Sequence, residues 1–270
     1  YVLEKSSWDR KGALWAVEFI EHINNIGLDI AVPQVIPAVN GAPVALHDGN
    51  VFILYKYIQG EKRNEATFAM RRNAACYLAQ FHYAGLKDKF IPVFGARNVD
   101  RIIDFHGSSD NRYGRIEGLW RRLQKEEGSR LSKAGQLFLA WHKFFVGRIE
   151  FIESIANHFY PDLFKCVIHG DFTLRNMLWQ ANSDKIVLVF DFDTARVEAR
   201  IFDLIRAFSF YQIRVDKSET VDLSDFDNWL LEYNHFADKF GIGITGKEIE
   251  AVSYMFDILG IIQYEWLARF

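Results

Sequence analysis

The residues best suited to chemistry lie in one segment of the chain, between Val167 and Asp193. Asp171 and Asn176 are five positions apart on an expected loop between two short strands, and Asp191 ends the next expected strand. Carboxylate and amide oxygens, together with phosphates and water, are the ligands that Mg²⁺ prefers. Phosphoryl transfer also needs a carboxylate that orients the attacking hydroxyl and accepts its proton, a role that suits Asp171. The segment therefore predicts a site for Mg²⁺ and a triphosphate.

The residue pattern around this segment predicts short strands and long helices. Short strands are expected at residues 167–168, 177–179 and 186–190. Helical spacing of apolar residues marks residues 66–84, 118–160 and most of 202–270. Gly85 is expected to follow the cap of the first of these helices, and breaks are expected near Lys217 and over 241–246. A polar stretch over residues 94–114 predicts a surface loop.

The N-terminal part predicts a small antiparallel sheet. A β-prone stub at residues 1–3 precedes a helix over 8–26, and two strands at 43–46 and 51–58 flank a turn that is typical of a hairpin. The fold class is therefore α+β with two lobes. We expect a small antiparallel β lobe over residues 1–57, a larger and mainly helical lobe over residues 58–270, and a hinge near residues 56–60.

Composition narrows the class of protein. The chain has 270 residues, half of them apolar and a quarter charged, with a net charge of −3, which excludes collagen-like and wholly disordered chains. There is no basic excess for nucleic acid, no apolar run long enough for a transmembrane helix, and no signal peptide. The two cysteines, Cys76 and Cys166, cannot build a disulfide framework. We therefore expect a cytoplasmic protein that binds neither membrane nor nucleic acid.

Two motifs in this order resemble the aminoglycoside phosphotransferase and choline kinase-like family of the protein-kinase-like fold. His169-Gly170-Asp171 with Asn176 matches its catalytic loop, and Asp191-Phe192-Asp193 matches its metal motif. The resemblance continues in the hinge strand, the helix after it and the segment after the metal motif, at residues 52–60, 78–85 and 202–204. The long helical insertion before the catalytic loop is most similar to the spore-coat CotS group of that family.

The resemblance implies a role for each matching residue. Asp171 would be the catalytic base, and Asn176 and Asp191 would hold Mg²⁺. The backbone carbonyl of Lys56 and the N–H of Ile58 would face the adenine edge of ATP, with Tyr55 behind it. Three further residues would support the site: Asp203 would brace the catalytic loop, His169 would anchor it, and Asp193 would either contact the metal or brace its turn.

The first strand departs from the family pattern. The family lysine that binds the α- and β-phosphates usually ends a strand of the form Tyr-Val-Leu-Lys, whereas this chain has Tyr1-Val2-Leu3-Glu4-Lys5. Lys5 is the candidate for that role, but side chains alternate across a strand, so a shift of one position turns Lys5 away unless a bulge restores its direction. Glu4 would instead point a carboxylate at phosphates. The strands expected upstream are absent, so the small lobe is expected to be N-terminally incomplete.

Two functional hypotheses follow. The first is an ATP- and Mg²⁺-dependent phosphotransferase that acts on a hydroxyl of a small molecule, with neither the substrate nor the oligomeric state selected by the sequence. The alternative is a weakly catalytic or non-catalytic kinase-like protein that binds ligands or associates with a spore coat. Gly241-Ile242-Gly243 with Gly246 formally matches a dinucleotide fingerprint, but it follows a helical stretch instead of a strand, and we reject that reading.

Overall fold

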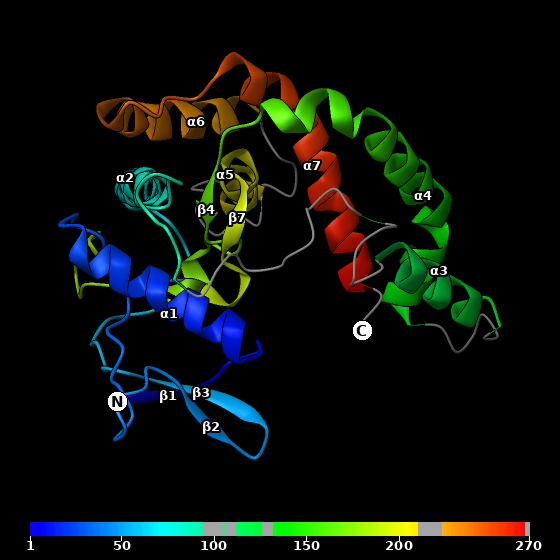
Figure 1. Cartoon of the computed structure of the whole chain (residues 1–270). Coiled ribbons are helices and arrows are strands. Elements are labelled where there is room, and N and C mark those ends of the chain that lie inside the picture. The colour runs from blue at the N-terminus through cyan, green and yellow to red at the C-terminus, as the bar shows by residue number, and fades with distance from the viewer. Residues whose placement is uncertain (94–104, 106–111, 126–131, 210–222, 268–270) are drawn as a thin grey trace. The chain divides into compact units, whose positions relative to one another are not determined.

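The computed structural model describes residues 1–93, 105, 112–125, 132–209 and 223–267. The chain forms two compact units (Figure 1). The first combines Tyr1–Asn98 with Phe164–Thr245, and the second combines Val99–Leu163 with Gly246–Phe270. The first unit therefore contains every residue that the sequence predicted for the site. The predicted α+β class is confirmed, with small antiparallel sheets among helices.

The N-terminal sheet is antiparallel, with strand order β1-β3-β2. Its strands are β1 (Val2–Lys5), β2 (Ala45–His47) and β3 (Asn50–Tyr55). The predicted hairpin joins β2 to β3, and Asp48 and Gly49 at its tip have φ values of 48° and 72°. Because β3 alternates between buried and half-buried residues, one face of the sheet is covered, and helix α1 (Arg10–Asn25) packs against that strand.

Helix α1 begins and ends where its sequence pattern indicates. The Asp9 carboxylate accepts a hydrogen bond of 2.8 Å from the N–H of Gly12, which caps the first turn. Gly27, just beyond the end, has a φ of +77° that glycine adopts at low cost. Apolar side chains such as Phe19 and Ile20 are fully buried along one face, so the predicted helix over residues 8–26 is confirmed.

Helix α2 (Phe68–Ala84) packs against α6 (Leu223–Ala237). The buried Arg71 guanidinium joins them through ion pairs of 2.5 Å with Asp225 and 3.0 Å with Glu232. The prediction that Gly85 follows the cap of α2 is wrong by one position, because Gly85 is itself the cap residue, with a φ of −83°. A Cβ atom at Gly85 would lie 2.8 Å from the Cβ of Val167, so close packing is what requires glycine there.

Two β ribbons carry the predicted catalytic segment. In one, β4 (Lys165–Ile168) pairs with β7 (Arg196–Ala199); in the other, β5 (Met177–Trp179) pairs with β6 (Ile186–Val189). Strands β4, β5 and β6 were predicted, but β7 was not, because it is short and two of its four residues are charged. Short 3₁₀ turns at Leu174–Asn176 and Phe192–Thr194 and helix α5 (Arg200–Ser209) complete this part.

The second unit is helical. It contains α3 (Arg112–Leu123), α4 (Lys133–Phe159) and α7 (Gly246–Leu267), with 3₁₀ turns at Tyr160–Asp162 here and at Asp238–Phe240 in the first unit. Tyr264 stacks on the rings of Phe138 and Phe145, with centroids 4.3 and 4.2 Å away. Most of the predicted loop over 94–114, and the predicted break at Lys217, lie outside the described residues. No described helix is both long and apolar enough to span a membrane.

Candidate active site

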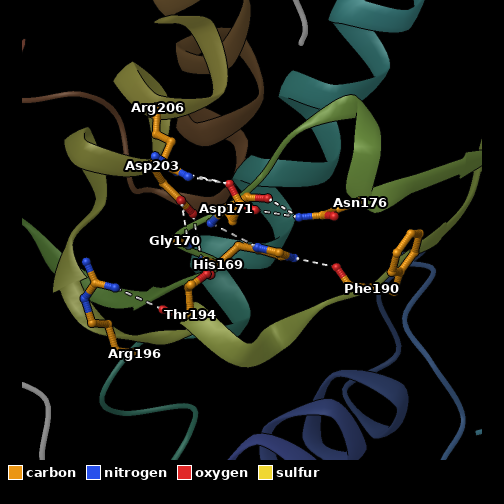
Figure 2. A network of polar contacts seen from close by, with 9 residues as sticks. All are labelled: His169, Gly170, Asp171, Asn176, Phe190, Thr194, Arg196, Asp203 and Arg206. Atoms are coloured by element: carbon orange, nitrogen blue, oxygen red, sulfur yellow. Dashed lines mark hydrogen bonds and ion pairs between the residues drawn. The ribbon is translucent and has the colours of Figure 1, made fainter. Parts of the chain in front are cut away.

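The predicted catalytic loop follows β4 and closes on itself, as Figure 2 shows. The side-chain N–H₂ of Asn176 donates to a carboxylate oxygen and to the backbone carbonyl of Asp171, both at 2.9 Å. The amide nitrogen of Asn176 therefore faces Asp171, and its Oδ1 atom faces the other way, available as a ligand for a cation. The structure thus brings together two of the three residues that the sequence singled out.

Arg206 is a functional candidate that sequence reasoning missed. Its Nε and Nη2 atoms donate to Oδ1 of Asp171 at 3.1 and 2.7 Å (Figure 2). The Asp171 side chain keeps 29% of its surface exposed, so a substrate can still reach the carboxylate. The signal was present in the sequence: Arg206 lies three residues after Asp203 on one helix face, and Asp203 was expected to contact the same loop.

Asp203 holds the start of the loop through backbone hydrogen bonds. Its two carboxylate oxygens accept from the N–H groups of His169 and Gly170, each at 2.8 Å. The carboxylate is fully buried, which by itself raises the pKa of Asp203, but hydrogen bonds from the His82 ring and the His169 backbone N–H, together with favourable electrostatic interactions with both residues, outweigh burial and lower it. The bracing contact expected of Asp203 is present in the structure.

His169 and Gly170 fix the loop against the metal motif. The N–H of Asp171 donates to Nδ1 of His169, so the ring carries its proton on Nε2, which donates to the Phe190 carbonyl at 3.1 Å. Gly170 has a φ of +77°, and a Cβ there would lie 2.6 Å from the Thr194 carbonyl oxygen. His169 therefore anchors the loop, as expected, and only glycine fits beside it.

Asp191 lies next to Asn176 across the β5–β6 ribbon. The N–H of Phe190 donates to the carbonyl of Asn176 at 3.0 Å, which aligns the two segments. Burial is the largest cause that raises the pKa of Asp191; the carboxylates of Asp193 and Asp171 add to it, while His169 opposes it. A cation beside these three carboxylates would relieve their repulsion.

The donor set fits Mg²⁺ held jointly with phosphates. One carboxylate and one amide oxygen are few ligands for a cage made of protein alone, and the described residues contain no group of three His, Cys, Asp or Glu residues that could hold a metal. Mg²⁺ usually takes one or two protein ligands and fills its octahedron with phosphate oxygens and water. Asn176 and Asp191 match that pattern.

A cavity of about 260 Å³ adjoins Asp191. It is lined by Val2, Glu4, Pro33, Tyr55, Lys56, Tyr57, Ile58, Lys62, Leu178, Leu188, Phe190 and Asp191. An apolar cavity with a few polar groups at one end is typical of a ligand site. The three predicted hinge residues, Tyr55, Lys56 and Ile58, all line it.

The hinge leaves backbone groups for a ligand. The N–H of Lys56 donates to the Gln34 carbonyl at 2.9 Å. Among the described residues, no backbone group forms a hydrogen bond with the Lys56 carbonyl or the Ile58 N–H. These are the two groups that the family resemblance assigns to the adenine edge, and the hinge geometry is compatible with that assignment.

Glu4, and not Lys5, faces the cavity. Strand β1 pairs with β3 in unbroken register, with Glu4 opposite Ile53, so no bulge redirects the next residue. Lys5 is exposed and does not line the cavity. Burial, reinforced by the charges of Asp193 and Asp191, raises the pKa of Glu4 to about 7. The structure therefore does not bring Lys5 to the site, for the reason that strand alternation gives.

Solved structures of small-molecule kinases share this fold. The microcompartment-associated aminopropanol kinase has a TM-score of 0.61 and 16% identity, covering 98% of this chain and 82% of its own. An amicoumacin kinase in complex with AMP-PNP, Ca²⁺ and Ami has a TM-score of 0.65 and 15% identity, covering 99% and 74%. An aminoglycoside phosphotransferase from Alicyclobacillus acidocaldarius has a TM-score of 0.55 and 14% identity, covering 99% and 85%.

These identities are low, so the similarity shows the fold alone. A comparison with curated proteins finds no match to this chain. The family comparison is broader, because the model of one family extends over the small sheet, the hinge and the catalytic segment. That family is APH, the phosphotransferase enzyme family, whose model matches residues 3–235, and the chain belongs to it.

Proposed function

We propose that the chain is an ATP- and Mg²⁺-dependent kinase that transfers the γ-phosphate to a hydroxyl of a small molecule. The observation that carries the proposal is the arrangement of Asp171, Asn176 and Asp191 beside a cavity lined by the hinge. Family membership supports phosphotransferase activity. Solved structures of similar fold hold AMP-PNP or AMP, in an amicoumacin kinase and a spectinomycin phosphotransferase, which supports ATP as the donor.

Each residue has a defined task in this proposal. Asp171 orients the acceptor hydroxyl and takes its proton while the hydroxyl oxygen attacks the γ-phosphorus and ADP leaves. Asn176 and Asp191 hold Mg²⁺, which when bound neutralises charge on the phosphates. The backbone of Lys56 and Ile58 binds the adenine edge, and Tyr55 closes the cavity behind it.

Several finer predictions belong to the same proposal. The small lobe would comprise residues 1–57 and the catalytic lobe residues 58–270, moving about the hinge. The substrate would be a small molecule with a hydroxyl, and neither nucleic acid nor a membrane would be a partner. Cytoplasmic location and similarity to the CotS group stay predictions from the sequence.

One observation favours the alternative of a weakly catalytic or ligand-binding protein. The Glu4 carboxylate lines the cavity where the family has a lysine, and a carboxylate opposes a triphosphate. Turnover separates the two hypotheses. A kinase releases ADP in the presence of an acceptor, whereas a ligand-binding protein binds nucleotide without turnover.

The test combines nucleotide binding with turnover. Calorimetry with Mg-AMP-PNP should show binding to the wild type and none to Asp191→Ala. ADP release in a screen of sugars, amino alcohols and aminoglycosides should identify an acceptor, and Asp171→Asn should lower that turnover about 10²- to 10⁴-fold while nucleotide still binds. Asp88→Asn, an exposed position outside the site, is the control. Absence of nucleotide binding by the wild type would contradict the proposal.

A further inference from the structure

The cavity poses a charge problem for the proposed nucleotide. Glu4 and Asp191 line it, and the charge of Asp193 acts on both of them. A triphosphate placed among carboxylates needs a protein cation as well as the metal, because buried charges are stable only when they are paired. Strand β1 does not supply that cation, since Lys5 is turned away.

Two lysines line the cavity, Lys56 and Lys62. Lys56 follows β3 directly and belongs to the hinge, where its N–H pairs with Gln34. Lys62 comes after the hinge, and its ammonium group donates to the backbone carbonyl of Arg175. Lys62 is therefore the lysine that contacts the catalytic loop.

The ammonium group of Lys62 contacts the residues that directly precede the two candidate metal ligands. Arg175, whose carbonyl it contacts, directly precedes Asn176. The same ammonium lies 4.1 Å from the ring centroid of Phe190, which directly precedes Asp191. Burial lowers the pKa of Lys62 and the Asp191 carboxylate opposes that shift, so the two charges interact.

The backbone on the N-terminal side of Lys62 is held in place. Glu61 and Trp179 exchange two backbone hydrogen bonds of 2.8 and 2.9 Å. A Cβ at Gly60 would lie 2.7 Å from the Cβ of Leu178 and 2.8 Å from a methyl of Val187. The linker after the hinge, residues 60–61, therefore packs closely against the β5–β6 ribbon. Lys62 itself is exposed, and its long side chain can exchange a carbonyl partner for a phosphate oxygen.

We propose that Lys62 binds the phosphates of the nucleotide in place of the lysine that the family carries at the end of its first strand. This inference rests on the proposed function. It explains how a chain with Glu4 at the strand position can still bind a triphosphate, because the cation comes from the segment after the hinge.

The experiment compares two probes by calorimetry, Mg-AMP-PNP and adenosine. Lys62→Ala should weaken binding of Mg-AMP-PNP about 10- to 100-fold, the range of a charge-assisted contact, and leave adenosine binding unchanged. Glu4→Lys combined with Lys62→Ala should restore binding of Mg-AMP-PNP, since it returns a cation to the cavity. Lys87→Ala, an exposed lysine of the same unit outside the cavity, is the control and should match the wild type.

Other outcomes separate the inference from the function. Wild-type affinity for Mg-AMP-PNP in Lys62→Ala would overturn the inference and leave the proposed function standing. If Lys62→Ala lost affinity for both probes equally, and Glu4→Lys did not restore it, the role of Lys62 would be to pack the segment after the hinge. That result would also overturn the inference. A wild type that binds neither probe would overturn both proposals.

Discussion

Asp171 is fixed from two sides, and each partner does different work. Asn176 turns its amide nitrogen to the carboxylate, which leaves its oxygen for a cation. Arg206 places a guanidinium on the other carboxylate oxygen. A base that is held by two partners needs little rearrangement when the hydroxyl arrives, and such positioning is a large part of catalysis in phosphoryl transfer.

Arg206→Ala should therefore lower kcat by about tenfold or more, since a displaced base loses its alignment with the hydroxyl. The affinity for Mg-AMP-PNP should stay unchanged, because Arg206 is not among the residues that line the proposed nucleotide cavity. Arg206→Lys, which keeps the charge and loses the planar fork, should retain part of the activity. Steady-state kinetics with calorimetry check this, and a loss of nucleotide affinity equal to the loss of kcat would contradict a positioning role.

Glu4 makes stability depend on pH. Its pKa is about 7 in the folded chain against an ordinary value of 4.5, so between these values the folded state holds a proton that the unfolded state has released. Stability therefore falls as pH rises through this window. Glu4→Gln should remove that loss and raise the free energy of unfolding at pH 8 by about 1–2 kcal/mol, allowing for solvent screening.

Chemical denaturation at pH 5 and pH 8 measures this effect. The difference between Glu4→Gln and the wild type should be clear at pH 8 and small at pH 5. Glu21→Gln, an exposed position on α1, controls for the substitution itself. An equal gain at both pH values would show that the charge of Glu4 is not the cause.

At this scale the sequence predicted what local spacing determines. Asp171 and Asn176 meet because five positions close one loop, and Lys5 faces away because side chains alternate along a strand. Arg206 was missed although its spacing from Asp203 on one helix face was a signal, and Lys62 was missed because only tertiary packing brings it to the loop. Their types alone, an Arg and a Lys, are equally typical of a solvated surface.

The catalytic loop is an element that depends on backbone contacts. Asp203 holds two of its N–H groups, and Thr194 donates its hydroxyl to the His169 carbonyl at 2.8 Å. Asp203 is itself held by His82, which also contacts the Tyr233 hydroxyl at 2.9 Å. His82 of α2, Asp203 of α5 and Tyr233 of α6 thus form one buried polar network that holds the catalytic loop in place.

Gly170→Ala should break this element. The positive φ disfavours alanine, and its methyl would overlap the Thr194 carbonyl, so the loop must shift away. We expect a loss of about 1–3 kcal/mol in the free energy of unfolding and a loss of turnover. Gly118→Ala in α3 is the matched control, because a Cβ added at Gly118 would meet nothing within 4 Å, and it should stabilise the helix by up to about 1 kcal/mol. A Gly170→Ala variant with full turnover would contradict the loop geometry.

Helices and the hairpin were predictable because periodic apolar residues and turn residues act locally. Strand β7 was not, since Arg196–Ala199 is only four residues long, two of them charged, and its pairing with β4 is made through backbone groups. Gly85 was interpreted through local helix-end chemistry, whereas its requirement comes from Val167, which is far away in the sequence. Structural features that depend on contacts with residues distant in the sequence cannot be predicted from the local residue pattern.

The whole molecule divides differently from the lobes that the sequence suggested. The change from strands to helices predicted a boundary after residue 57, and that boundary stays a prediction. In the structure the first compact unit contains both sides of the hinge. The reason is visible in the contacts: Ser7 and Trp8, from the small sheet's end, donate to Asp193, and the linker after the hinge pairs with β5.

All proposed nucleotide contacts fall within this first unit, which leads to a prediction for the whole chain. A ligand that binds the folded state slows amide exchange where it suppresses local opening. With Mg-AMP-PNP, exchange should slow at residues 56–62, 169–176 and 190–194, and it should stay unchanged in α4 of the second unit. Hydrogen exchange with mass spectrometry measures this, with Asp191→Ala as the control that loses the protection. Protection confined to α4 and α7 would place the nucleotide in the helical unit and remove the basis for assigning Asp171 as the base.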